Sequence, residues 1–157
     1  MAAKQTMIFA LDDTDHSFYA LEWTLDHFFG STSSLFKLVI VHVKTTPTSV
    51  VGLAGPGTSD VLMLVETDIK KTAQRVCEKA KQLCEAKGVN DVELDVFEGD
   101  ARNVLCEVVD KHHAAVLVMG SHGYGTFKRA VLGSVSDYCS HHARCSVMIV
   151  KKPKAKN

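Results

Sequence analysis

The chain has 157 residues and a formal net charge of zero, because 18 basic side chains balance 18 acidic ones. This length is typical of one domain, and the balanced charge predicts no general attraction to nucleic acid or anionic lipid. No apolar run reaches the roughly 18 residues that span a membrane, and no secretory pattern opens the sequence. We therefore expect a cytoplasmic protein with a single domain over residues 1–157, an ordered core over about 5–151 and a basic tail over 152–157.

The first part of the chain alternates apolar runs with helical periodicity. Residues 7–11 form a short apolar run, which is typical of a strand buried on both faces. Apolar residues then recur at spacings of three and four from Phe18 to Phe28, which predicts an amphipathic helix that Gly30 ends. Residues 35–43 form a second apolar run and are predicted to be the second strand.

A long segment over residues 44–60 follows, with two prolines and several glycines. Because loops of this length are usually functional or disordered, we expect it to cover a binding site. Asp60 is expected to cap the next helix, whose apolar face runs from Leu62 to Leu83 and which Gly88 ends.

The second part repeats the same alternation. Residues 92–97 alternate apolar and acidic side chains, which predicts a half-exposed strand at a sheet edge. Asp100 is expected to cap a third helix, and residues 114–119 are predicted to be the fourth strand. A last helix is predicted over 134–142 and a last strand over 146–150.

Strands that alternate with helices predict βαβ units and a parallel sheet with right-handed crossovers. We predict a three-layer α/β/α, Rossmann-like fold with five parallel strands in the order 3-2-1-4-5, since the third strand looks like an edge and the first is fully apolar. In this order successive strands are first added on one side of strand one and then on the other, so the topological switch point lies between strands one and four. Ligands bind at the carboxyl ends of the strands at such a point. Asp12 and Gly120 end these two strands.

A glycine-rich stretch after the fourth strand carries the clearest functional signal. Two residues separate Gly120 from Gly123, and nine separate Gly123 from the pair Gly133 and Ser134. Glycine lets a backbone approach a ligand closely, and the N–H groups of such a loop and of the following helix start form an anion site. The stretch is therefore predicted to hold phosphate.

This spacing, together with the aspartate at the end of strand one, resembles the ATP-binding signature of the universal stress protein (UspA) family. The resemblance covers residues 7–150, and residues 19–23 are similar to the plant-type branch. It implies an adenine nucleotide alpha hydrolase-like fold and an ATP-binding regulator of the cellular stress response. The ligand would be ATP, AMP or ADP, with Mg²⁺ or Mn²⁺ bound through the phosphates.

The resemblance also implies roles for particular residues. Gly120 and Gly123 would contact phosphate and ribose through their backbone, Asp12 would lie at the adenosine end, and the helix start from Gly133 would line the phosphates. Adenine would be recognised by backbone groups at three strand ends. From its place in the loop, His122 can help to screen phosphate charge or can be a plain surface side chain. The complete implied set is Ala10, Asp12, Val43, Met119, Gly120, His122, Gly123, Gly133, Ser134, Val135 and Ser136.

Several of these residues also have a simpler interpretation. Asp12 can be a helix cap, and Gly120 can serve a tight turn without any ligand. Ser134 and Asp137 have the spacing of a capping box, in which Ser134 would only start a helix. His42 is interpreted as a buried histidine with a hydrogen-bond partner, not as a catalytic group.

Motifs for catalysis are missing from the sequence. It has no P-loop with its lysine and no Gly-x-Ser-x-Gly elbow, so ATP is expected to be bound better than it is hydrolysed, and we predict no enzyme. The alternatives are a slow ATP hydrolase, an interaction scaffold with a vestigial pocket, and a flavodoxin-like FMN protein.

The last strand leads to a prediction of homodimers. Val147, Met148, Ile149 and Val150 come last in the predicted strand order and so form an apolar edge, which is a hazard if it is left unpaired. Pairing with a second copy about a two-fold axis would satisfy this edge, and the family resemblance implies the same interface.

The cysteines indicate a reducing compartment. The chain has five, with no Cys-x-x-Cys spacing, and Cys77, Cys84 and Cys106 fall among the apolar positions of predicted helices. They are interpreted as small buried thiols.

Overall fold

The computed structural model describes residues 3–30, 34–47, 58–121 and 133–153. The predicted tail from residue 154 onward and residues 48–57 of the predicted covering segment lie outside this part. In chain order the elements are β1 (Gln5–Leu11), α1 (Asp15–Phe28), β2 (Phe36–Lys44), α3 (Thr58–Ala86), β3 (Val92–Glu98), α4 (Ala101–His112), β4 (Val116–Gly120), α5 (Ser134–His142) and β5 (Ser146–Val150).

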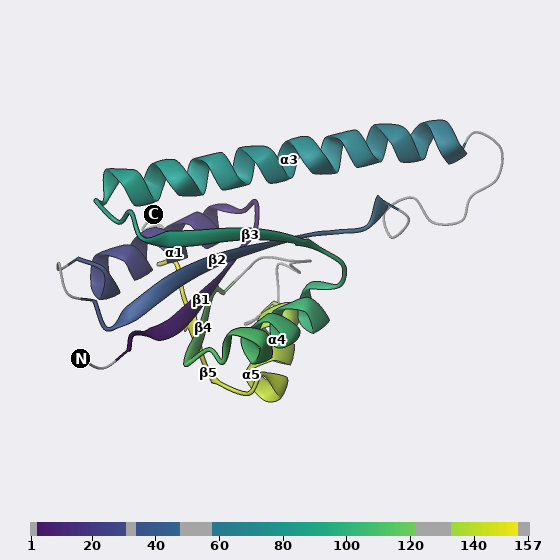
Figure 1. Cartoon of the computed structure of the whole chain (residues 1–157). Coiled ribbons are helices and arrows are strands. Elements are labelled where there is room, and N and C mark those ends of the chain that lie inside the picture. Colours follow the sequence, from purple (N-terminus) through teal and green to yellow (C-terminus); the bar gives the residue numbers. More distant parts are fainter. Residues whose placement is uncertain (1–2, 31–33, 48–57, 122–132, 154–157) are drawn as a thin grey trace.

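The five strands form one parallel sheet in the order β3-β2-β1-β4-β5, as predicted (Figure 1). β1 lies at its centre and pairs with β2 on one side, from Gln5 opposite Phe36 to Leu11 opposite His42. On its other side β1 pairs with β4, where Met7 lies opposite Val116. The topological switch point, where the order of strand addition reverses, therefore lies between β1 and β4.

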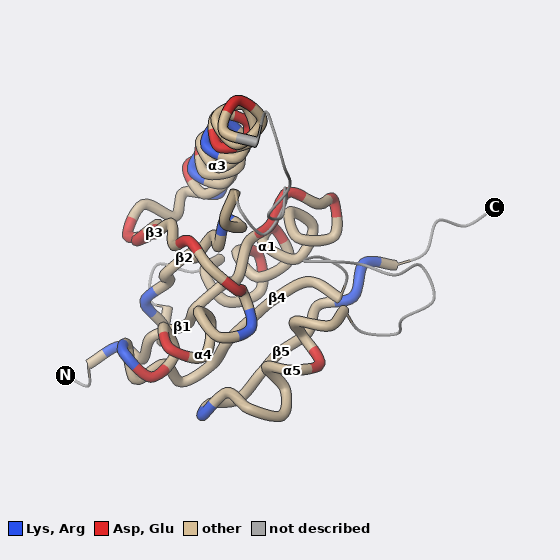
Figure 2. The backbone as a smooth tube through the Cα atoms, turned by 90° about the vertical axis from the view of Figure 1, so that its right-hand side faces the viewer, with Lys and Arg blue, Asp and Glu red and all other residues tan. Residues whose placement is uncertain are grey.

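The helices cover the sheet in two layers, with α1 and α3 on one face and α4 and α5 on the other (Figure 2). Successive side chains of a strand point to opposite faces, so Met7, Phe9 and Leu11 pack toward α1 and α3. Ile8 and Ala10 pack toward α4 and α5. This confirms the three-layer fold and explains why β1 reads as a continuous apolar run.

The two edges of the sheet differ. β3 alternates half-buried and exposed side chains from Val92 to Leu94, as predicted for an edge strand, but the predicted alternation fails at Val96, which is 42% exposed. β5 is the other edge, and Val147, Met148 and Ile149 are half-buried there. Both edges are thus less covered than the central strands.

Several element ends differ from the sequence prediction. α1 ends at Phe28, and the glycine at 30 is needed for space, because a Cβ atom there would lie 2.9 Å from the Asp26 carbonyl oxygen. α3 starts at Thr58, so Asp60 lies in its first turn and the prediction that Asp60 caps this helix is wrong. Gly88 does end α3, with a φ of +71°.

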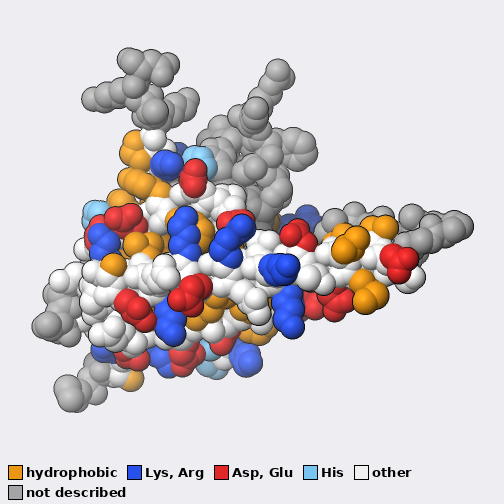
Figure 3. All heavy atoms as spheres, turned by 90° about the horizontal axis from the view of Figure 1, so that it is seen from above, with side chains coloured by type: hydrophobic (Ala, Val, Ile, Leu, Met, Phe, Trp, Pro, Cys, Tyr) orange, Lys and Arg blue, Asp and Glu red, His pale blue; other side chains and the backbone are white. Residues whose placement is uncertain are grey.

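α3 is long and extends past the carboxyl ends of the strands (Figure 1). Its first turns expose apolar side chains: Val61 is 46% exposed, Met63 68% and Leu64 72%. Figure 3 shows apolar atoms gathered at this projecting end of the helix. None of the helices in the described ranges has the length and apolar character to cross a membrane.

Candidate functional site

Asp12 lies directly after β1 and is buried. Its backbone N–H donates to the Ser17 hydroxyl at 2.9 Å, and its carboxylate accepts a hydrogen bond from the Thr14 hydroxyl at 2.5 Å. The Thr14 oxygen also accepts from the Ser17 N–H at 3.1 Å, so Thr14 is the cap of α1. The simpler interpretation of Asp12 as the helix cap is therefore wrong, and its carboxylate is held in place by the true cap.

His42 connects the ends of β1 and β2. It is 6% exposed, and its Nδ1 lies 2.8 Å from the Leu11 carbonyl oxygen. Because a carbonyl can only accept, Nδ1 must carry the hydrogen. This confirms the interpretation of His42 as a buried histidine with a partner.

A cavity of about 280 Å³ lies beside these residues, between the ends of β1 and β2 and the side of α3. Two predicted site residues, Asp12 and Val43, line it. The sequence prediction missed the contribution of α3, since it treated Ile69 only as part of an apolar face. The remaining lining residues are Asp13, Thr14, His42, Lys44, Thr45, Asp68, Ile69 and Thr72.

The charge of this cavity is mainly acidic. Asp12, Asp13 and Asp68 line it together with one basic side chain, Lys44, and Asp13 forms an ion pair with Arg75 of α3. Carboxylates accept hydrogen bonds and repel other anions, so the cavity suits a group rich in hydroxyl and amino donors. It suits a phosphate less well, although Lys44 is part of the lining.

The three residues predicted to recognise adenine lie in one core cluster on the α4 and α5 side of the sheet. Ala10, Val43 and Met119 are at most 4% exposed there. Their side chains are therefore core residues, and only their backbone groups are left to contact a ligand, as the sequence interpretation requires.

Gly120 ends β4 against the start of α1. A Cβ atom at this position would lie 2.9 Å from the His16 carbonyl oxygen and 3.3 Å from the Ser17 nitrogen. Glycine is thus required by the approach of two backbone segments, which supports the simpler interpretation of this residue. A contact of Gly120 with a ligand stays a prediction.

The glycine-rich loop begins and ends at one place. The Ser121 N–H donates to the Val150 carbonyl at 3.1 Å, and the Gly133 N–H donates to the Ser121 carbonyl at 3.1 Å. His122 and Gly123, which were predicted to contact the nucleotide, lie outside the described residues.

The start of α5 differs from the predicted capping box. Gly133 is the N-cap and makes no side-chain cap hydrogen bond, while Ser134 is already the first helical residue. Ser134 is exposed, but Val135 and Ser136 are buried, and the Ser136 hydroxyl donates to the Gly133 carbonyl at 2.9 Å. A ligand at this helix start would thus meet backbone N–H groups and not the Ser136 hydroxyl.

Metal ligands are not gathered in the part of the chain that the structure describes. No group of three or more His, Cys, Asp or Glu side chains there could hold a metal ion.

A parallel sheet with helices on both faces and a crevice at its topological switch point defines an α/β protein of the Rossmann-like class. Among solved structures, UspA from Lactobacillus plantarum has a TM-score of 0.72, with 18% identity over 95% of this chain and 99% of its own. A universal stress protein family protein from Arabidopsis thaliana, solved with AMP bound, has a TM-score of 0.69, with 26% identity over 95% of this chain and 92% of its own.

Sequence comparison identifies the family. The chain is 32% identical to a universal stress protein A-like protein of Arabidopsis thaliana, over 85% of this chain and 77% of the relative. It is 30% identical to the Arabidopsis universal stress protein PHOS34, over 96% of this chain but only 63% of the relative. The pattern of the universal stress protein family matches residues 4–151, and the chain belongs to this family.

Proposed function

We propose that this protein binds an adenine nucleotide, ATP or AMP, at the carboxyl ends of β1 and β4, and acts as a nucleotide-dependent regulator in the cytoplasmic stress response. The observation that carries the proposal is the pairing of an acidic cavity at Asp12 with a helix start at Gly133 that has no side-chain cap hydrogen bond. The AMP-bound Arabidopsis relative, at 26% identity over nearly the whole chain, supports it.

The two ends of the site favour one orientation of the nucleotide. The carboxylates of Asp12 and Asp68 suit the hydroxyl donors of ribose and repel phosphate. The start of α5 offers backbone N–H groups and the positive end of the helix dipole, which suit phosphate. The adenosine would therefore lie toward β2 and α3, and the phosphates toward α5.

The nucleotide would act as a ligand and not as a rapidly consumed substrate. His42 is the buried histidine of the cavity, and its Nδ1 is occupied by the Leu11 carbonyl. The carboxylates nearby lie at the proposed adenosine end, away from the phosphates. Mg²⁺ or Mn²⁺ would be bound through the phosphates themselves.

Calorimetry tests this proposal. ATP and AMP should bind the wild-type protein, while Asp12→Asn should lose about tenfold to a hundredfold in affinity, as expected for a hydrogen bond to a charged group. Asp91→Asn, at an exposed aspartate on the turn before β3, is the matched control and should bind like wild type. Absence of binding at millimolar nucleotide would contradict the proposal, and multiple turnover of ATP would favour the hydrolase alternative.

We also propose that the protein forms a homodimer through β5. β5 is an edge of the sheet, and its apolar side chains Val147, Met148 and Ile149 are only half-buried. Pairing with a second copy would bury them further. Light scattering at micromolar concentration should give twice the 17.1 kDa of one chain, with or without nucleotide. A monomer under these conditions would contradict the dimer.

A further inference from the structure

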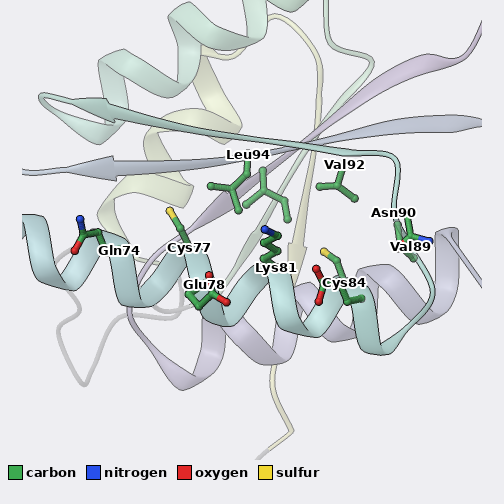
Figure 4. Close-up of a pocket in the computed structure, with 11 residues that line it drawn as sticks. Gln74, Cys77, Glu78, Lys81, Cys84, Val89, Asn90, Val92 and Leu94 are labelled. Carbon is green, nitrogen blue, oxygen red and sulfur yellow. The ribbon is translucent and has the colours of Figure 1, made fainter.

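Another cavity, of about 520 Å³, lies between α3 and the strands β2 and β3 (Figure 4). Ile40, Val92 and Leu94 of the strands form one wall, and Cys77 and Cys84 of α3 form the opposite wall. The sulfur atoms of both cysteines point toward the strands. This cavity shares no lining residue with the cavity at Asp12.

The cavity is open because α3 covers the sheet unevenly. Ala73, Val76, Ala80 and Cys84 are the side chains of α3 that pack closely and are buried, and Cys84 lies where this buried line meets the cavity. The edge strand β3 lies to one side of this line, so Val92 and Leu94 stay half-buried. Covering such apolar surface is favourable by about 25 cal/mol per Å², and the volume lies in the usual range of small-molecule sites.

A single cation lies among the apolar walls. Lys81 lines the cavity, and Figure 4 shows its nitrogen between the two cysteines, on the side of the strands. Among the ion pairs found within the described residues, none involves Lys81. Glu78 and Glu85 also line the cavity, and Figure 4 shows Glu78 on the side of α3 away from the strands.

We propose that this cavity is a second ligand site, which binds a small, mainly apolar molecule that carries one acidic group. The apolar body would lie on Ile40, Val92 and Leu94, and the acidic group would pair with Lys81. Glu78 and Glu85 repel a multiply charged anion more strongly than a singly charged one, so nucleotide phosphates are disfavoured. The site therefore does not depend on nucleotide binding at Asp12.

The cysteines provide a built-in measure of occupancy. Burial raises the pKa of the Cys77 thiol, so it reacts slowly at neutral pH but remains half-buried and reachable. Burial also raises the pKa of Cys106 and Cys145, which lie on the opposite face of the sheet. A ligand in the cavity should shield Cys77 and leave these two thiols unchanged.

The test measures how tightly the full chain binds 8-anilinonaphthalene-1-sulfonate, a probe that has an apolar body and one sulfonate. Lys81→Gln should weaken its binding about fivefold, as expected for a partly exposed ion pair, while Lys71→Gln, at an exposed lysine of the same helix, should not. Cys77→Phe should fill the cavity and weaken binding by at least about tenfold. Saturating AMP should not displace the probe.

Mass spectrometry of alkylated cysteines gives a second measurement on the wild-type protein. The probe should slow the alkylation of Cys77 severalfold and leave that of Cys106 unchanged. If Cys77→Phe fails to fold, this measurement still decides. Equal binding by Lys81→Gln and Lys71→Gln, displacement by AMP, or no protection of Cys77 would each overturn the proposal.

Discussion

Helices α1 and α5 both begin at the carboxyl edge of the sheet, but they begin in different ways. The start of α1 is capped by its own side chains, because Thr14 accepts the Ser17 N–H and Ser17 in turn accepts the Asp12 N–H. α5 starts at Gly133, which makes no side-chain cap hydrogen bond. A helix start that its own chain caps gains little from a ligand, whereas a start without such a cap can accept a ligand oxygen in that role.

A third helix resembles α1 and not α5 in this respect. α4 lies on the same face of the sheet as α5, and its N-cap, Asp100, accepts a hydrogen bond from the Arg102 N–H at 2.9 Å. α1 and α4, which lie on opposite faces of the sheet, thus both have side-chain caps, and neither starts at the proposed phosphate site.

The largest effect is expected where α1 meets β4. Gly120→Val should destabilise the protein by about 3 kcal/mol, because the new Cβ atom would overlap the His16 carbonyl. Thermal unfolding should show a loss of roughly 10 °C. Gly120→Ala should already show most of this loss. A normal melting temperature with impaired nucleotide binding would mean that Gly120 serves the ligand alone.

The start of α5 should affect binding and not stability. Ser134→Pro removes one N–H at the first helical position, where proline is well tolerated, and Gly133 already has the extended φ of −65° and ψ of 157° that a residue before proline prefers. AMP or ATP affinity measured by calorimetry should fall about tenfold or more, with little change in melting temperature. Ser134→Ala keeps the N–H and is the matched control. Equal affinities for the two variants would remove the backbone of Ser134 from the site.

The start of α1 should affect stability, and it should affect binding only indirectly, through the Asp12 carboxylate that Thr14 holds. Thr14→Ala removes the cap and should cost about 1 kcal/mol in the free energy of unfolding. Thr14→Ser keeps a hydroxyl and should lose much less. Denaturant unfolding with and without saturating AMP measures both. Because saturating AMP stabilises any variant that binds it, the quantity to compare is the difference between wild type and Thr14→Ala. If AMP abolished this difference, the ligand would be capping α1 as well.

The smallest effect concerns the cap of α4. Hydrogen bonds from Arg102 hold the pKa of the Asp100 carboxyl below its ordinary value of 3.8, so its charge stabilises the folded state above that pH. Asp100→Asn should cost about 0.5 kcal/mol at pH 7, since this side chain is 44% exposed and screened. The difference from wild type should shrink as the pH falls through 3.8 and below. A constant difference down to pH 2 would show that charge plays no part.

The strands and their order could be predicted from the sequence because each central strand is buried on both faces. The apolar runs of β1 and β2 have no other simple interpretation, and the alternation in β3 marks an edge. The cap of α4 was also predictable, since Asp100 follows a glycine and precedes a clear apolar periodicity. The structure gives this glycine, Gly99, a φ of +146°.

The details of the candidate site were less predictable. Ser134 and Asp137 match a capping box, but the helix starts one residue earlier than this pattern requires, and Gly133 takes the cap position. Gly120 shows a second limit, because a glycine signals close approach without saying whether a ligand or another backbone approaches. Periodicity likewise places Ile69 on a helix face but not at the end of a particular strand.

The hydrogen bond between the Gly133 N–H and the Ser121 carbonyl brings the two ends of segment 122–132 together. Once such ends are fixed by the body of a protein, doubling the length of the connection costs only about 0.6 kcal/mol in closure entropy. The position is therefore suited to exchange: a longer or shorter segment with different side chains can be grafted between Ser121 and Gly133 at little cost to folding. Such a graft would replace the side chains of this segment while the sheet and its helices stay the same.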